Sequence, residues 1–185
     1  MDFRQKFYDI TNLIRQEFDR SLELYGDKIQ CRKGCSKCCS QIFRITPLDG
    51  WIITDHVKSL PEEKRNILVE KAKEYKPPSV SPPEEGMRQE CPALGSEGEC
   101  TIYEARPVIC RRFGMPIYDY KNPGKVHACE LNFKDGEEIT DPILIHNQTE
   151  IGKKWDELKA EFAVASVPRT DSTTIAEAIV KGEKD

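Results

Sequence analysis

The sequence predicts a mainly α fold with irregular loops, in which amphipathic helices surround a cysteine-ligated centre and leave room for one short strand pair. Two observations support this prediction. Apolar residues recur at steps of three and four in several segments, which is the spacing of one helix face. Eight cysteines lie between those segments, and the second half of them fall in a stretch rich in Gly and Pro, residues that interrupt regular structure.

The first helix is expected over residues 2–25, followed by Gly26 as a C-terminal stop. Its apolar side chains share one face, which we expect to pack in the core, although a partner-binding helix is the alternative. That face consists of Phe3, Phe7, Ile10, Leu13, Ile14, Phe18, Leu22 and Tyr25.

A second helix is expected over residues 47–59, after "QIFRIT", which reads as a short strand or an extended segment. Thr46 is its N-cap, Pro47 occupies the first helical position, and Asp49 completes a capping box. The side chains expected to face the core are Trp51, Ile52 and Val57.

The segment "SLPEEKRNILVEKAKEY" repeats this start signal with Ser59, Pro61 and Glu62, and predicts a solvated surface helix. Its one apolar face would hold Ile67, Leu68, Ala72 and Tyr75. Prolines between residues 77 and 83 then exclude a helix and predict an extended connector.

Two helices are expected near the C-terminus, within residues 147–181. Asn147 would cap the first, with Glu150 at the third position of a capping box. Its core face would consist of Ile151, Trp155, Leu158 and Phe162. The second covers about 173–181 and ends at Gly182. We expect one domain over 1–185, because a chain of 185 residues suits a single domain, with a metal-binding core at 31–129.

Charge and hydropathy exclude two classes of partner. The net charge of −4 provides no basic surface for a phosphate backbone, so nucleic acid is not expected. The N-terminus lacks the apolar region of a signal peptide, and no apolar run reaches the length of a bilayer span, so no membrane association is expected. We therefore expect a cytoplasmic protein.

The cysteines fall into two groups of four, and all eight are candidate metal ligands. Short gaps allow a turn, eased by Gly34, to bring several thiolates to one centre. Cytosolic thiols are normally reduced, which favours metal over disulfides, but a disulfide-linked interaction domain remains the alternative. Four thiolates suit both zinc and iron-sulfur centres. The candidates are Cys31, Cys35, Cys38, Cys39, Cys91, Cys100, Cys110 and Cys129.

Other residues near these cysteines have two readings each. Cys38 and Cys39 are adjacent, and in an extended segment their side chains would point to opposite sides, so they would serve different centres or roles. His127 is either an extra ligand or a solvated loop residue. Basic side chains either offset the charge of a thiolate centre or are ordinary surface charges; they are Lys33, Lys37, Arg111 and Arg112.

The pattern "CRKGCSKCC", "CPAL", "CTIYEARPVICRRFG" and a last cysteine at 129 resembles the YkgJ-like cysteine-cluster family of zinc- or iron-chelating domains, over residues 31–129. This resemblance implies a centre bound by the family cysteines, with a [4Fe–4S] cluster as first candidate and zinc as second, and a structural or redox role. A related domain occurs in flagellin lysine methylases, so the resemblance also implies an alternative, a protein-modifying enzyme such as an iron-sulfur-containing protein lysine methylase. An oxidoreductase is the other form of the enzyme alternative. Either reading implies a protein partner or protein substrate.

Overall fold

The computed structural model describes residues 2–32, 34–42, 44–76, 88–124, 126–134, 139–165 and 173–183. The chain divides into two compact units, each built from two stretches of sequence. Unit 1 comprises residues 1–32 and 108–167, and unit 2 comprises residues 33–107 and 168–185. The predicted class, mainly α with irregular loops, is confirmed, and two short strand pairs occur where one was expected. The expectation of one domain stays a prediction.

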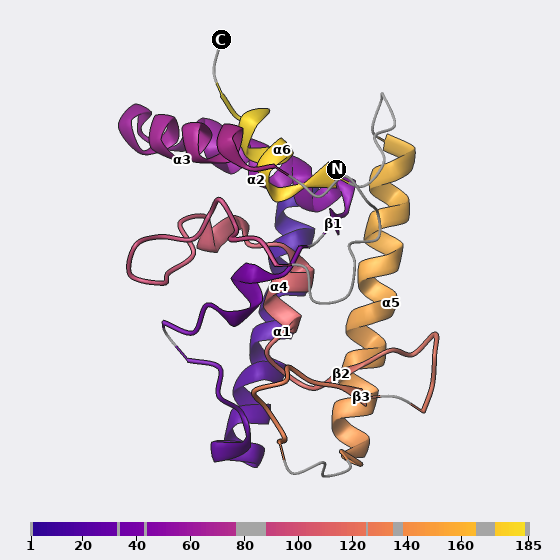
Figure 1. Cartoon of the computed structure of the whole chain (residues 1–185). Coiled ribbons are helices and arrows are strands. Elements are labelled where there is room, and N and C mark those ends of the chain that lie inside the picture. Colours follow the sequence, from indigo (N-terminus) through magenta and orange to yellow (C-terminus); the bar gives the residue numbers. More distant parts are fainter. Residues whose placement is uncertain are drawn as a thin grey trace. The chain divides into compact units, whose positions relative to one another are not determined.

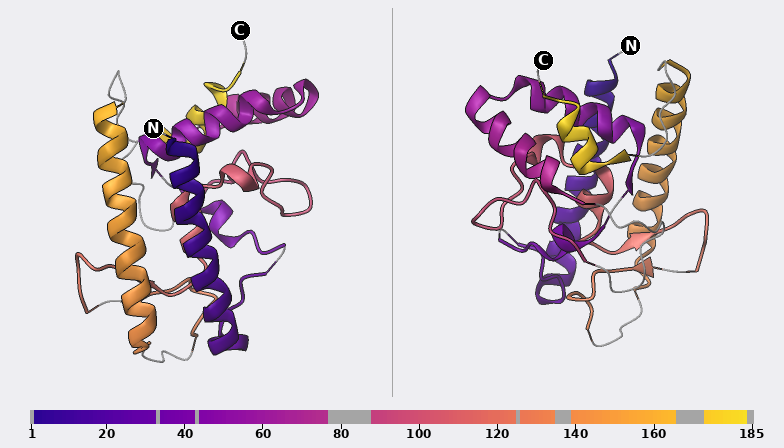
Figure 2. Two further views of the ribbon diagram at one scale, coloured as in Figure 1. Left: turned by 180° about the vertical axis from the view of Figure 1, so that it is seen from behind. Right: turned by 45° about the horizontal axis from the view of Figure 1, so that its top comes forward.

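Unit 1 is built on two long helices, α1 (Phe3–Tyr25) and α5 (Pro142–Ala165), which lie side by side (Figures 1 and 2). Aromatic rings of the two helices pack edge to face. The ring centroids of Phe3 and Phe162 lie 5.2 Å apart, and those of Phe7 and Trp155 lie 6.1 Å apart. The periodic apolar face expected of residues 2–25 therefore packs in a core. The helix ends as predicted at Gly26, whose φ of +44° favours glycine.

Helix α5 begins at Pro142, five residues before the predicted start, so the expected cap at Asn147 was wrong. Asp141 supplies the start signal, because its Oδ1 accepts from the amide of Ile143 at 2.9 Å and Pro142 occupies the first position. The expected core positions Ile151, Trp155, Leu158 and Phe162 are buried.

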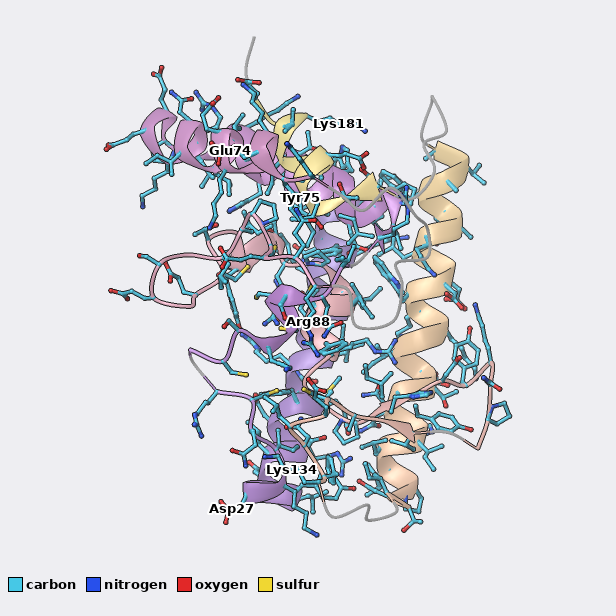
Figure 3. The ribbon with its side chains drawn as sticks, in the orientation of Figure 1. Asp27, Glu74, Tyr75, Arg88, Lys134 and Lys181 are labelled. Carbon is cyan, nitrogen blue, oxygen red and sulfur yellow. The ribbon has the colours of Figure 1, made fainter. Side chains whose placement is uncertain are left out.

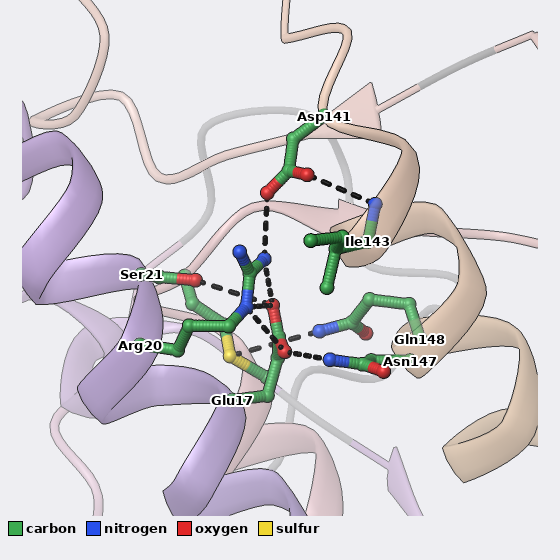
Figure 4. A network of polar contacts seen from close by, with 8 residues as sticks. Glu17, Arg20, Ser21, Asp141, Ile143, Asn147 and Gln148 are labelled. Atoms are coloured by element: carbon green, nitrogen blue, oxygen red, sulfur yellow. Dashed lines mark hydrogen bonds and ion pairs between the residues drawn. The ribbon is translucent and has the colours of Figure 1, made fainter.

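Asn147 instead joins a polar network between α1 and α5 (Figure 4). At its centre is Glu17, which is 2% exposed and accepts from Arg20 and from Asn147 Nδ2, each at 2.6 Å. Arg20 also donates to Asp141 at 2.7 Å. Burial opposes ionisation of Asp141, but the hydrogen bond from Arg20 and those from backbone amides lower its pKa. The network pairs the buried charges of both helices.

The other described elements of unit 1 are short. The 3-10 turn η1 (Gly26–Lys28) follows α1, and α4 (Val108–Arg112) packs against α1. Strands β2 (Ile117–Tyr118) and β3 (Val126–His127) pair antiparallel, with Ile117 opposite His127.

Unit 2 packs α6 (Ile175–Val180) against both α2 (Pro47–Ser59) and α3 (Glu62–Glu74). Strand β1 (Arg44–Ile45), within the predicted "QIFRIT" strand, pairs antiparallel with β4 (Thr173–Thr174). The capping box of Thr46 and Asp49 is present, and Thr174 with Glu177 forms a second one at α6. Residues 77–83, the predicted proline-rich connector, lie outside the described residues.

Three details of α2 and α3 differ from the predictions. Ser59 does not cap α3; it is the last residue of α2, and its hydroxyl donates to the carbonyl of His56 at 2.6 Å. Trp51 was expected to face the core but is 39% exposed, and Ile67, which was placed on the apolar face of α3, is 66% exposed. Their helices instead bury Ile52, Val57, Leu68 and Ala72. No helix among the described residues is both long enough and apolar enough to cross a bilayer.

Candidate metal centre

The adjacent pair Cys38 and Cys39 lies on the 3-10 turn η2 (Lys37–Ser40), not on an extended strand. The amide of Cys39 donates to the carbonyl of Ser36 at 2.8 Å, and this turn brings the Cys38 and Cys39 thiols into hydrogen-bond contact. The expectation that the two side chains would point to opposite sides was therefore wrong, because the segment is tightly turned. Gly34, at φ +89°, provides the preceding turn as predicted.

A second segment of unit 2 brings Cys91 and Cys100 to this pair. The amide of Cys91 donates to the carbonyl of Cys39 at 2.7 Å, and the amide of Gln89 donates to the carbonyl of Ser40 at 3.1 Å. Beyond Cys91 the chain folds back, so that Cys100 forms a β-bridge with Leu94. Backbone hydrogen bonds thus align two stretches that are distant in sequence, and each stretch contributes two thiols.

The thiols of these two stretches shift one another's pKa values. The hydrogen bond to Cys38, burial, and the charges of Cys38, Cys91 and Cys100 all raise the pKa of Cys39. The same hydrogen bond lowers the pKa of Cys38 against the effect of burial, and Arg106 lowers it further. Burial raises the pKa of Cys91 to about 11. We call these four residues the unit 2 thiol cluster: Cys38, Cys39, Cys91 and Cys100.

Two cationic side chains border the unit 2 thiol cluster. Arg106 Nη2 lies 3.4 Å from Cys38 Sγ. The charge of Lys71 on α3 opposes the larger effect of burial, which raises the pKa of Cys91, and the Lys71 ammonium donates to the carbonyl of Leu94. Tyr75, which is labelled in Figure 3, follows Lys71 by one helical turn. Burial and the charge of Cys91 raise the pKa of Tyr75.

Sequence reasoning did not single out Arg106 or Lys71 as neighbours of a thiol. It considered Lys33, Lys37, Arg111 and Arg112 for charge compensation because these lie beside cysteines in the sequence. Arg112 packs in unit 1, where its Nη2 donates to Gln148 Oε1 at 2.8 Å and burial lowers its pKa. Lys33 lies outside the described residues. The sequence offered one signal that was not used for Arg106, namely its position just before Pro107. A residue before proline disfavours helical backbone, so η3 (Tyr103–Ala105) ends there and Arg106 has a non-helical backbone.

Unit 1 contains Cys31, Cys110 and Cys129. Cys31 Sγ donates to the carbonyl of Gly114 at 3.3 Å, and Asn132 donates to the same carbonyl. A Cβ at Gly114 would lie 2.2 Å from Cys31 Sγ, so glycine permits this close approach. Cys129 is buried, and its carbonyl accepts from the amide of Asn132 at 2.8 Å. Cys31 thus has a defined role in unit 1, joining two loops through its thiol.

The remaining predicted positions are Cys35, Cys110 and His127. Cys35 is half-buried in unit 2, Cys110 is half-buried on α4, and His127 is exposed on β3. Among the described residues, no three Cys, His, Asp or Glu side chains are already arranged to hold one ion. A metal would therefore have to draw the thiols together, and the assignment of all eight cysteines as ligands stays a prediction.

The donor chemistry of the unit 2 thiol cluster fits a zinc or iron centre, because clustered thiols beside a cation favour thiolate ligation. Residues 30–131 match the model of the CxxCxxCC family, described as a "putative zinc- or iron-chelating domain". The match covers more than half of the 185 residues, so the chain belongs to this family, as its resemblance predicted. No curated protein and no solved structure matches the chain.

Proposed function

We propose that the unit 2 thiol cluster holds a metal centre, with a [4Fe–4S] cluster as first candidate and zinc as the alternative. The observation that carries this proposal is the convergence of two distant segments, joined by the hydrogen bond from the Cys91 amide to the Cys39 carbonyl at 2.7 Å. Four thiols supplied by two such segments form the donor set that these metals prefer.

The contact between adjacent thiols favours the iron-sulfur alternative. Cys38 and Cys39 share one tight turn, and their thiols are in hydrogen-bond contact. A cluster with several metal ions offers each of two neighbouring sulfurs a different ion, whereas one zinc ion would have to accept both in a tetrahedral array. An iron-sulfur cluster would supply one-electron chemistry, and a closed zinc site would be structural.

A redox centre implies a protein partner that exchanges electrons with it, and we propose such a partner for the iron form. The methylase and oxidoreductase alternatives rest on the family resemblance and stay predictions. The cytoplasmic location and a ligand set that also includes the other four cysteines stay predictions as well.

The test is the metal and acid-labile sulfide content of protein purified without oxygen and without chelators. Iron with sulfide is expected for the wild type. Cys38→Ser and Cys91→Ser should lose most of the metal, because each removes one of four thiolates. Cys129→Ser is the matched control, since it removes a buried thiol from unit 1.

The outcomes separate the alternatives. Zinc without sulfide would exclude the cluster and favour a structural site. Loss of metal from Cys129→Ser equal to that from Cys38→Ser would contradict the four-cysteine centre. A wild type that binds neither metal would overturn the proposed function.

A further inference from the structure

Arg106 donates to a thiol of the unit 2 thiol cluster, with Nη2 at 3.4 Å from Cys38 Sγ. Its backbone is held on both sides. The Arg106 amide donates to the carbonyl of Tyr103 at 3.2 Å, and the buried Pro107 follows. Ile102 and Ala105, in the turn before it, are 1% and 0% exposed. The guanidinium therefore extends from a fixed turn rather than from a mobile loop.

We propose that Arg106 tunes the metal centre, by stabilising negative charge on the Cys38 sulfur and thereby retaining the metal and favouring the reduced state. This inference rests on the proposed function. Hydrogen bonds to thiolate sulfurs and nearby charge are among the features that set the potential of iron-sulfur centres. A charge-assisted hydrogen bond is also stronger than a neutral one.

The direction of the effect follows from charge. A thiolate-rich centre is negative, and one electron taken up by its iron makes it more negative by one unit. A fixed cation at Cys38 lowers the free energy of both states and lowers that of the reduced state more. Removal of the cation should therefore weaken metal retention and shift the midpoint potential to more negative values.

Arg88 provides the matched control. It is an exposed arginine of the same unit, labelled in Figure 3, and its Nη1 lies 3.4 Å from Ser40 Oγ, two residues beyond Cys38. Arg88→Gln therefore removes an equal charge beside the same turn but leaves the thiol contact in place. Arg106→Gln removes the contact, and Arg106→Lys keeps the charge while losing the planar guanidinium.

The experiment measures metal release to EDTA from the protein carrying its own metal, and, for the iron form, the midpoint potential in a titration with dithionite. Circular dichroism of each metal-loaded variant confirms folding. Arg106→Gln should release metal about tenfold faster than the wild type, the factor expected for one charge-assisted hydrogen bond. For the iron form, a tenfold change in the redox equilibrium of Arg106→Gln would shift its midpoint potential by about 59 mV to more negative values, for a one-electron couple. Arg106→Lys should lie between the wild type and Arg106→Gln.

Three results decide the matter. Release and potential unchanged in a folded, metal-loaded Arg106→Gln protein would overturn the inference while leaving the proposed function intact. Equal changes in Arg88→Gln would also overturn it, because the effect would then be one of overall charge. A wild type that contains no metal would instead overturn the proposed function itself.

Discussion

Replacement of the buried Glu17 by alanine should destabilise unit 1 strongly. Its carboxylate is 2% exposed and accepts from Arg20 and from Asn147 Nδ2, each at 2.6 Å (Figure 4). Removing one partner of a buried ion pair costs about 3–5 kcal/mol. Arg20 keeps Asp141 at 2.7 Å and its side chain is 23% exposed, which reduces the cost. We therefore expect the lower end of that range, about 3 kcal/mol.

Urea unfolding followed by fluorescence measures this change. The chain contains two tryptophans, and Trp51→Phe leaves Trp155 on α5 as the reporter of unit 1. With a urea slope of about 1–3 kcal/mol per molar, a loss of about 3 kcal/mol lowers the midpoint by about 1–3 M. Metal loading must be the same in all samples, because a ligand that binds the folded state alone shifts apparent stability.

Glu150→Ala is the control for this experiment. Glu150 pairs with Lys153 on the same helix at 3.2 Å, but the two side chains are 45% and 52% exposed. Such a surface pair contributes about 0.5 kcal/mol or less. If Glu17→Ala moved the midpoint no further than Glu150→Ala does, the argument that the buried network stabilises the packing of α1 and α5 would be refuted.

Three further changes have calculable effects on unfolding, measured in the same way. Gly182→Ala should cost about 1–3 kcal/mol by overpacking, because its Cβ would lie 2.6 Å from the Cβ of buried Val57; an unchanged midpoint would contradict that clash. Thr46→Ala removes the N-cap of α2 and should cost about 1 kcal/mol, with helix content by circular dichroism as the check. Asp141→Asn keeps a cap but loses the charge pair, so it should cost about 0.5–1 kcal/mol at neutral pH. Because the folded pKa of Asp141 is lowered, its contribution is present above about pH 4, the unfolded value, and disappears as pH falls through the folded pKa; a difference from wild type that does not shrink as pH falls below about 4 would contradict this assignment.

The helices could be predicted where their signals are local. Thr46, Pro47 and Asp49 are consecutive or nearly so, and together they set the start of α2 whatever the rest of the chain does. The start of α5 was misplaced because two cap-like signals compete within six residues. The side chain of Asn147 binds Glu17, which is 130 residues away in sequence, so no local pattern reveals that Asn147 lies inside the helix.

Periodicity also predicts a helix face better than it predicts burial. Ile67 and Leu68 are adjacent on α3, yet Leu68 is 6% and Ile67 is 66% exposed. Which of them is covered depends on α6, a six-residue helix more than 100 positions later that packs on α3. Helix α6 reaches that position through the β1 and β4 pair, which is a long-range contact.

The candidate site shows the same division between local and distant information. Cysteine spacing identifies the thiols, because turns of two or three residues suffice to bring neighbours together. It does not reveal that Cys38 and Cys39 share a 3-10 turn, nor that the contact between Arg106 and Cys38 spans 68 residues. A sequence neighbour such as Arg112 was a natural candidate for compensating charge, but its guanidinium binds Gln148 in unit 1, because proximity in the chain is a weak guide to proximity in a folded loop.

Because the cysteines are distributed between the two units, measuring how metal changes the stability of each unit can test which cysteines are ligands. Metal binding contributes free energy to the unit whose thiols it holds, because those thiols do not converge in the unfolded chain. A centre on Cys38, Cys39, Cys91 and Cys100 should therefore raise the unfolding midpoint reported by Trp51 in unit 2 by more than the midpoint reported by Trp155 in unit 1. Ligands among Cys31, Cys110 and Cys129 would make the Trp155 midpoint rise by at least as much. Unfolding of Trp155→Phe and Trp51→Phe proteins with and without metal distinguishes the two assignments, and an increase confined to Trp155 would contradict the four-cysteine centre.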